Sequence, residues 1–380
     1  MKIAYAALAV LSVWTGQAAA NDGDLARFSR VWELARKERP IRLATIGGSI
    51  TGGAGASERT QCWPEVMVQA WRKKFPRSEI TLVNAGIGAT GSKIGACRLK
   101  DDVLVHRPDV VVVEFSVNDD ASQDCAEAYE GLMRQLLSDP NGIAVIALGM
   151  MNKDGWSVQE RHREVARHYG ITFVSYRDAY FPSVRDGRLK WTEIAADSIH
   201  PNDRGHALAA GLLDDLLFAD YDAYAAHPIP IRTAQAVKAP LYGSRFDYGR
   251  FVRMKDAEIV ANEGFFPLKD AAWGMGLACT NANGRLLVRA KGRAVAILYR
   301  KGCAPYNWGK IAVSLDGGEP RVIDCFSDQW WWYTPDVFLC RDAPGEHLIE
   351  IRTLPEKNPK SRGYGCHLTG ILVCEAEGLH

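Results

Sequence analysis

Short apolar runs alternate with amphipathic stretches through the first half of the chain. Stretches such as 64–74 and 158–169 carry apolar residues at helical spacing with charges between them. The continuous valines of 110–113 indicate a strand that is covered on both faces. Alternating strands and helices predict a three-layer α/β/α domain with a parallel sheet, and a (β/α)₈ barrel would need more such units before residue 228. The predicted strands are 41–46, 80–83, 110–115, 143–148 and 171–174.

The pattern changes after His227-Pro228-Ile229-Pro230, which marks a domain boundary. Beyond it, short and mostly alternating apolar runs are separated by turn signals such as Asp316-Gly317-Gly318. Regular strands with turns predict an antiparallel all-β sandwich or jelly-roll domain. We therefore predict domains at 21–228 and 241–380, joined by a linker at 229–240. The predicted strands of the second domain are 284–290, 294–299, 311–315, 321–325, 347–351 and 367–373.

Residues 1–20 are typical of a secretory signal peptide. Lys2 supplies a positive start, residues 3–14 are apolar, and Ala18-Ala19-Ala20 offers a small-residue cleavage site. The apolar run is too short to span a bilayer, and no later run approaches the roughly 18 residues required. We expect cleavage after Ala20 and a mature protein that is periplasmic or secreted, with no membrane span.

Charge and cysteine usage narrow the picture further. The chain has 46 Lys and Arg against 45 Asp and Glu, so nothing favours binding to nucleic acid or an anionic membrane. Nine cysteines fit an oxidising compartment, although their connectivity cannot be read from the sequence. We predict a Cys62–Cys97 bridge, three bridges in the second half and a free Cys125. No C-x-x-C pair is present, so we expect no structural metal.

The first predicted strand ends abruptly at Gly47-Gly48 and is followed at once by Ser49. Reacting groups collect at this carboxyl edge in open α/β sheets, which makes Ser49 a candidate nucleophile. Two other interpretations compete. Glycine-rich turns also bind phosphates, but residues 47–55 contain neither a G-x-x-x-x-G-K-[ST] nor a G-x-G-x-x-G pattern. A serine after glycines can also be a turn residue or a helix N-cap.

Polar clusters follow the other predicted strands and supply partners for that serine. A serine hydroxyl needs an adjacent base, usually histidine, and the histidine needs a carboxylate that orients it. Asp197 and His200 are three residues apart, so one turn can present both side chains. An oxyanion needs donors, which the glycine-rich loop and Asn118 would supply. Each residue alone also fits a structural role: Asp197 as a helix cap, and His200 as a buried structural histidine.

These residues resemble the SGNH, or GDSL-like, hydrolase family over about residues 41–220. The four similar blocks, in the family's order, are Gly47-Gly48-Ser49-Ile50-Thr51, 84–90, 113–119 and the D-x-x-H-P of 197–201. The resemblance implies a flavodoxin-like fold and a Ser49, Asp197, His200 triad. It also implies an oxyanion hole that includes the Ala89 N–H and the Asn118 side chain, and no cofactor. An α/β-hydrolase is disfavoured because position 51 is Thr where G-x-S-x-G requires Gly.

The chain departs from the family pattern in three places. Gly48 replaces the aspartate of the family name, which is not the nucleophile. Ala89 stands in place of the oxyanion glycine, so its methyl group can narrow the pocket or alter φ. Ser116-Val117 replaces a small glycine-rich pair before Asn118. Outside the triad, we expect Glu114 to be a hydrogen-bonded structural carboxylate and His206 to pack at a helix start.

We expect a secreted serine esterase that removes acetyl or other short acyl groups, with acylated carbohydrate or another small ester as its substrate. The rivals are a lipase or thioesterase on longer chains, an acyltransferase with the same triad, and a non-catalytic polysaccharide-binding protein. Trp330-Trp331-Trp332-Tyr333 invites a sugar-stacking role, but consecutive strand residues face opposite ways, so we favour a structural one. Oligomeric state cannot be read from the sequence.

Overall fold

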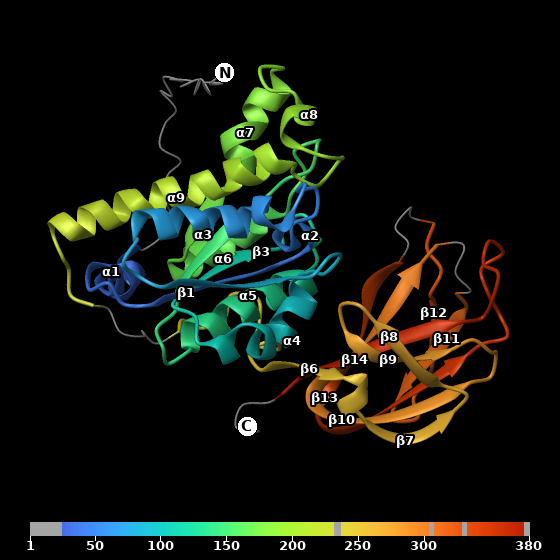
Figure 1. Ribbon diagram of the computed structural model, residues 1–380. Helices are drawn as coiled ribbons and strands as arrows, with labels where there is room; N and C mark the ends of the chain where they lie inside the picture. The colour runs from blue at the N-terminus through green and yellow to red at the C-terminus, as the bar shows by residue number, and fades with distance from the viewer. Residues whose placement is uncertain (1–24, 232–236, 304–307, 329–332, 376–380) are drawn as a thin grey trace.

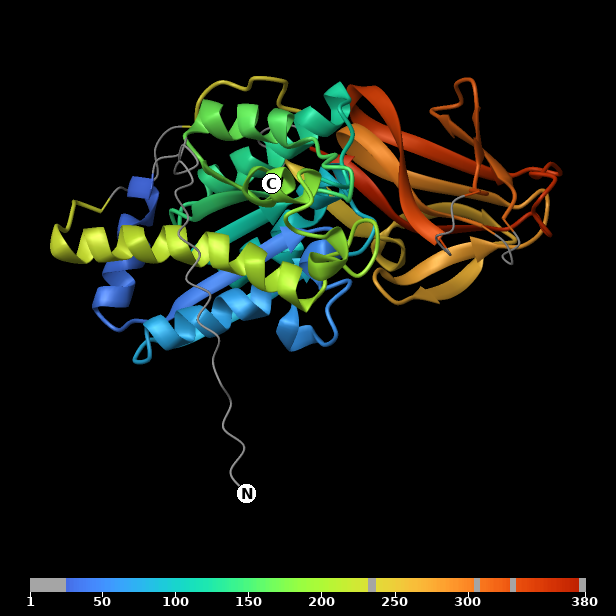
Figure 2. The same ribbon diagram turned by 90° about the horizontal axis from the view of Figure 1, so that it is seen from above.

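The chain contains one parallel and one antiparallel sheet, arranged side by side (Figures 1 and 2). The computed structural model describes residues 25–231, 237–303, 308–328 and 333–375. The predicted signal peptide with its cleavage site, and the tryptophans at 330–332, lie outside these residues. Within the described ranges, no helix combines the length and hydropathy needed to cross a membrane.

The first sheet is parallel and has the strand order β2-β1-β3-β4-β5. The valine strand β3 lies at its centre with every residue buried, as the continuous apolar run predicted. All five predicted strands are present, with ends shifted by three residues at most. The strands are β1 Ile41–Gly47, β2 Ile80–Gly86, β3 Val110–Glu114, β4 Ala144–Gly149 and β5 Thr172–Ser175.

Helices cover both faces of this sheet, which confirms the three-layer α/β fold. The helices that pack on one face are α1 Ser29–Arg36, α3 Trp63–Lys74 and α9 Asp203–Ala226. Those that pack on the other face are α4 Ser92–Asp102, α5 Gln123–Ser138 and α6 Gln159–Tyr169. Near the carboxyl ends of the strands lie the shorter α2 Ser49–Gly52, α7 Tyr176–Arg185 and α8 Trp191–Ile194. Short 3₁₀ helices occupy Leu25–Phe28, Arg59–Gln61, Leu104–His106 and Met254–Asp256.

The second domain is antiparallel and all-β, as predicted, and its strands form one continuous sheet curled into a half-barrel. The order is β12-β11-β13-β10-β14-β9-β8, with β6 added to β14 and β7 added to β10. The strands are β6 Gly249–Arg253, β7 Glu258–Glu263, β8 Phe266–Asp270, β9 Gly274–Cys279, β10 Arg285–Gly302, β11 Lys310–Leu315, β12 Arg321–Asp324, β13 Tyr333–Thr353 and β14 Cys366–Cys374.

The predicted strands 284–290 and 294–299 are in fact one strand, β10. The glycine between them forms a bulge instead of a turn, because the register with β13 shifts between Gly292 and Ala294. A side chain at Gly292 would lie 2.6 Å from Val373 Cγ1, so the close approach of β14 requires glycine there.

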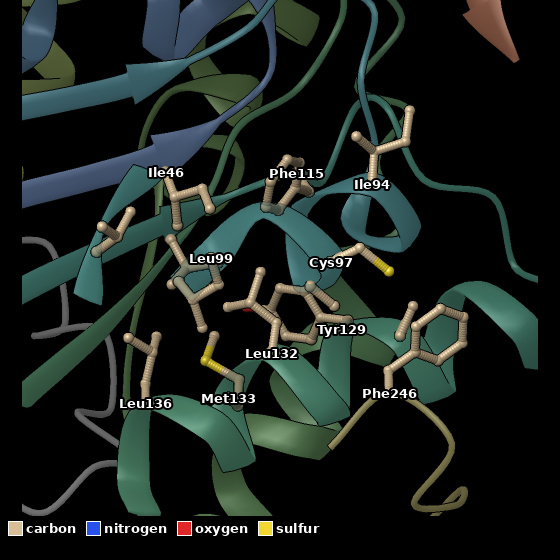
Figure 3. Packing of buried hydrophobic residues seen from close by; sticks show 14 of the residues in the cluster. Ile46, Ile94, Cys97, Leu99, Phe115, Tyr129, Leu132, Met133, Leu136 and Phe246 are labelled. Atoms are coloured by element: carbon tan, nitrogen blue, oxygen red, sulfur yellow. The ribbon is translucent and has the colours of Figure 1, made fainter. Parts of the chain in front are cut away.

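The two domains share one apolar core. Helix α4 packs against β6 and β14, and a single buried cluster joins Leu99 and Leu132 of the first domain to Phe251 and Leu372 of the second. Figure 3 shows part of this cluster, with Phe246 of the connecting segment beside α5. Glycine is needed at Gly249 because a Cβ atom there would lie 2.8 Å from the Ala96 carbonyl oxygen.

The segment that leads into β6 is attached along α5. Glu130 Oε1 and Oε2 accept the N–H groups of Leu241, Tyr242 and Gly243 at 2.6, 2.6 and 3.2 Å. One helical turn earlier, Glu127 Oε1 accepts the N–H of Arg245 at 3.0 Å. We call this arrangement the carboxylate clasp. Helix α9 ends at Ala226, and the predicted domain boundaries stay a prediction.

The predicted Cys62–Cys97 disulfide is wrong. Both residues are free thiols, and Cys97 instead lies in the buried cluster that also contains Cys374 of the second domain. Cys62 precedes α3 and Cys97 belongs to α4, so the two sit with helices on opposite faces of the sheet. Three bridges in the second half are also excluded, because three of its six cysteines are free thiols: Cys279, Cys366 and Cys374.

Candidate active site

The turn after β1 places Ser49 at the carboxyl edge of the sheet, as the first residue of α2. Backbone packing at the preceding residues admits only glycine. A Cβ atom at Gly47 would collide with the Thr51 side chain and the Glu114 carbonyl, and one at Gly48 would collide with the Asn118 side chain. The two glycines therefore let the end of β1 approach the end of β3 closely at the serine turn.

The structure brings Ser49, His200 and Asp197 into one connected line. Ser49 Oγ lies 2.9 Å from His200 Nε2, and His200 Nδ1 lies 2.7 Å from Asp197 Oδ2. An ionised carboxylate only accepts hydrogen bonds, so Nδ1 carries the ring proton of the neutral imidazole. The Nε2 lone pair then faces the serine hydroxyl, which is the tautomer that can remove its proton.

The Asp197 carboxylate is ionised, and its side chain is 41% exposed. Burial raises its pKa, but hydrogen bonds donated by the His200 N–H, the His200 ring and the Ile199 N–H outweigh that effect. The pKa of Asp197 is therefore lowered from its ordinary value. The two backbone bonds, at 2.8 and 2.7 Å to Oδ1, leave Oδ2 aimed at the ring.

The candidate oxyanion residues, Asn118 and Ala89, belong to the segments that follow β3 and β2. Asn118 packs its side-chain amide against Gly48, one residue from the serine. Ala89 has a φ of 57°, a left-handed conformation that is rare for a residue with a side chain. The departure from glycine at this position thus costs backbone strain. Sequence reasoning missed Gly88, where a Cβ atom would lie 3.8 Å from that of Ser49.

Two side chains, the half-buried Asn84 and the buried Arg98, support the nucleophile turn. Asn84 donates from Nδ2 to the Thr51 carbonyl at 2.9 Å and accepts the Gly86 N–H at 2.9 Å. Arg98 of α4 donates from Nη2 to the Gly47 carbonyl at 3.1 Å. Asn84 belongs to the second family block, but nothing in the sequence marked Arg98 because it lies within an ordinary helical pattern.

A second Asp–His pair lies beneath the Asn118 segment, and sequence reasoning missed it. Asp119 Oδ1 accepts the Ser92 N–H at 2.7 Å, and Asp119 Oδ2 lies 3.1 Å from His162 Nε2. Both side chains are almost completely buried, at 1% and 2% exposed. The His162 ring stacks on Tyr129, with 3.6 Å between ring centroids and 2° between planes. The pair thus ties the Asn118–Asp119 turn to the start of α4 and to α6.

Glu114 and His206 have the structural contacts that were predicted for them. Glu114 is fully buried at the end of β3, where burial raises its pKa to about 7 and Thr51 donates a hydrogen bond of 3.1 Å. His206 accepts the Trp63 N–H at Nδ1 and lies 3.1 Å from the Ala54 carbonyl at Nε2. Burial lowers the pKa of His206, so the neutral ring links α9 to the start of α3 and to the loop after α2.

Within the part of the chain that the structure describes, no three histidine, cysteine or acidic side chains are grouped to hold a metal ion. The arrangement around Ser49 instead combines a nucleophile, a base with the correct tautomer and a neighbouring amide. Such a set performs acyl transfer through a covalent intermediate.

Comparison with known proteins agrees with this class. Residues 45–208 match the model of the GDSL-like lipase/acylhydrolase family. A two-domain esterase called CEX, active on acetylated mannans, is 27% identical in a crystal structure with mannopentaose. It superposes with a TM-score of 0.85 over 95% of this chain and 97% of that chain. A second crystal structure of a two-domain esterase with that name matches with a TM-score of 0.84.

A curated relative points the same way over a shorter stretch. The acetylxylan esterase of Xylanibacter ruminicola is 25% identical over 45% of this chain and 42% of its own length. The chain therefore aligns with less than half of that relative. The family, the relative and the solved esterase confirm the predicted enzyme class, a carboxylic ester hydrolase with a GDSL-like domain followed by a β domain.

Proposed function

We propose that the protein is a secreted esterase that removes acetyl groups from carbohydrate by a Ser49–His200–Asp197 mechanism. The observation that carries the proposal is the continuous hydrogen-bonded line from the Ser49 hydroxyl through His200 to Asp197. The substrate class is supported by two relatives, one described as active on acetylated mannans and one as an acetylxylan esterase.

The proposed reaction begins when Ser49 Oγ attacks the acetyl carbonyl while His200 Nε2 takes the hydroxyl proton. Asp197 keeps the ring oriented and stabilises the imidazolium that forms. The carbonyl oxygen becomes an oxyanion, for which the N–H groups of Ser49 and Ala89 and the Asn118 side chain are the proposed donors. His200 then protonates the sugar oxygen as its bond to the acyl carbon breaks, which releases the sugar hydroxyl and leaves Ser49 acetylated.

Water completes the cycle. His200 removes a proton from a water molecule as it attacks the acetyl-enzyme, and collapse of the second tetrahedral intermediate releases acetate and restores the serine. Each proton taken by His200 is returned within the same half-reaction, so no cofactor is consumed.

The deciding experiment compares Ser49→Ala with Ser57→Ala on p-nitrophenyl acetate and on acetylated mannan and xylan oligosaccharides. Ser57 is a matched control, because it is exposed nearby and bonded to Asp203 instead of His200. We expect Ser49→Ala to reduce acetate release by roughly 10⁴-fold or more with an unchanged circular dichroism spectrum. Retained turnover in that variant would place the nucleophile elsewhere.

Acyl length separates acetylesterase from lipase or thioesterase activity. We expect kcat/KM to fall from p-nitrophenyl acetate to the butyrate and octanoate esters. A rise with chain length would favour the longer-acyl alternative over deacetylation.

A further inference from the structure

The loop that follows β4 has a rigid local structure. The Asn152 side-chain oxygen accepts the N–H groups of Asp154 and Trp156 at 3.0 and 2.9 Å, and the Asn152 N–H donates to the Trp156 carbonyl at 3.1 Å. Gly155 has a φ of 73°, and the Phe181 ring occupies the place where a side chain would lie. The backbone on both sides of Trp156 is therefore fixed before any ligand binds.

This loop bridges two parts of the candidate active site. The Lys153 N–H donates to the Ser198 carbonyl at 2.9 Å, which fixes the loop to the Asp197–His200 segment. The Val158 N–H donates to the Ser116 carbonyl at 2.9 Å, two residues before Asn118. Trp156 lies between these two anchors. The loop thus places it at the rim of the site, between the acid–base segment and the oxyanion segment.

Trp156 is unusual because of its exposure. Trp32, Trp63 and Trp71 of the same domain are completely buried, whereas Trp156 is 48% exposed. Among residues 25–228, Val105 is the one other large apolar side chain in this exposed class, and it belongs to the 3₁₀ helix Leu104–His106, which precedes β3. A rigid loop that keeps an indole in water forgoes hydrophobic burial, which is expected where the ring contacts a ligand.

We propose that Trp156 is a stacking platform for a pyranose ring of the acetylated glycan, and this rests on the proposed deacetylation at Ser49. The C–H face of a pyranose is apolar, and an indole offers a flat apolar partner beside hydroxyl groups that stay in water. The acetylated sugar enters between the two anchored segments, and Trp156 holds the same ring or its neighbour. Trp156 thereby selects polysaccharide esters over small esters of the same acyl group.

The test measures a ratio of specificity constants. We expect Trp156→Ala to lower kcat/KM for acetylated manno- or xylo-oligosaccharide about 10-fold more than for p-nitrophenyl acetate, mainly through KM. Trp156→Phe, which keeps a flat ring, should recover most of the loss. The matched control Val105→Ala removes an exposed apolar side chain elsewhere and should leave the ratio unchanged.

A binding measurement separates this inference from the proposed function. Isothermal titration calorimetry with unacetylated mannopentaose and xylopentaose should give about 10-fold weaker binding to Trp156→Ala than to the wild type. The same difference is expected when both proteins also carry Ser49→Ala. Equal oligosaccharide binding and an unchanged ratio in Trp156→Ala would overturn the platform while p-nitrophenyl acetate turnover leaves the esterase intact. If the wild type hydrolyses no ester but its oligosaccharide binding still depends on Trp156, only the deacetylation proposal is overturned.

Discussion

Two Asp–His pairs lie at the same edge of the parallel sheet, and they differ in what surrounds them. In the Asp197–His200 pair the atoms are 2.7 Å apart, and the side chains are 41% and 10% exposed. In the Asp119–His162 pair they are 3.1 Å apart, and both side chains are sealed from solvent. The remaining ring nitrogen of His200 faces Ser49, whereas Nδ1 of His162 has no hydrogen-bond partner among the described residues.

This difference shows how one chemical pair serves two purposes. A base must reach its substrate and exchange protons with solvent, so it needs partial exposure and a free ring nitrogen directed at a reacting atom. A buried pair with a stacked ring instead ties chain segments together. We therefore interpret Asp197–His200 as the acid–base pair and Asp119–His162 as a brace for the Asn118 turn.

The largest expected effect is the loss of esterase activity when His200 is replaced. His200→Ala should lower kcat/KM for p-nitrophenyl acetate by about 10⁴-fold or more, because the serine loses its base. The thermal unfolding midpoint should change little by comparison, because the Asp197 carboxylate that is left behind is 41% exposed and keeps its two backbone donors. Steady-state kinetics and a melting curve on the same sample check both parts. Activity within 10-fold of the wild type would contradict the assignment.

Asp197→Asn should have the next largest effect, on kcat. The amide can donate to Nδ1, which favours the wrong tautomer and removes the charge that stabilises the imidazolium, so we expect a loss of roughly 10⁴-fold. Steady-state kinetics with p-nitrophenyl acetate measure this loss, and activity within 10-fold of the wild type would argue against the role of Asp197 in orienting His200.

His162→Ala should act on stability. Removing the imidazole leaves Asp119 Oδ2 buried without its partner, and breaking a buried pair in this way typically costs about 3–5 kcal/mol of unfolding free energy. Urea denaturation measures the loss, and His162→Gln, which keeps a donor near Asp119, is the control that should lose less. A change below about 1 kcal/mol would show that the buried pair does not brace the fold.

Glu114, which interacts with the charge of Asp119, makes the unfolding free energy depend on pH. Burial first, and then the charge of Asp119, raise its pKa from 4.5 to about 7 in the folded state. Between these values the folded protein holds a proton that the unfolded chain has lost, so the unfolding free energy falls as pH rises from 4.5 to 7. Glu114→Gln removes this dependence and should gain up to about 3 kcal/mol relative to the wild type across that window. A pH-independent difference between the two proteins would contradict the shift.

The smallest expected effect is on stability and concerns Tyr129, whose ring stacks on His162. The Tyr129 hydroxyl is buried without a hydrogen-bond partner among the described residues. Tyr129→Phe keeps the stacked ring and removes an unsatisfied group, so stability should change by no more than about 0.5 kcal/mol or rise slightly. Tyr129→Leu, which loses the stack, should cost more in the same denaturation experiment. Equal losses in both variants would show that the hydroxyl carries the effect.

The acid–base pair could be predicted from the sequence, whereas the brace could not. Asp197 and His200 are neighbours in a short motif, so their distance is set by one local turn. Asp119 and His162 are 43 residues apart, and only the packing of α6 on the sheet brings them together. The cysteine pairing failed for the same reason, because it depends on which faces of α3 and α4 meet other elements.

The parallel sheet was predicted well, but four strands of the second domain were missed. Buried parallel strands are continuously apolar and stand out in a sequence, as 110–113 does. Strands β7 and β8 expose nearly every residue, so neither shows the alternation that marks a half-buried strand. Short edge strands of this kind are defined by hydrogen bonds to their neighbours and not by a hydrophobic face.

The carboxylate clasp has a practical consequence for anyone who dissects or recombines the two domains. A cut at residue 228 would strip Glu127 and Glu130 of the backbone donors that they now satisfy, and it would uncover the groove that Phe246 fills beside Gly131. Residues 237–248 are thus an outer layer of the catalytic unit. A chimera that exchanges the β domain should therefore be joined just before β6, where the guest sheet begins.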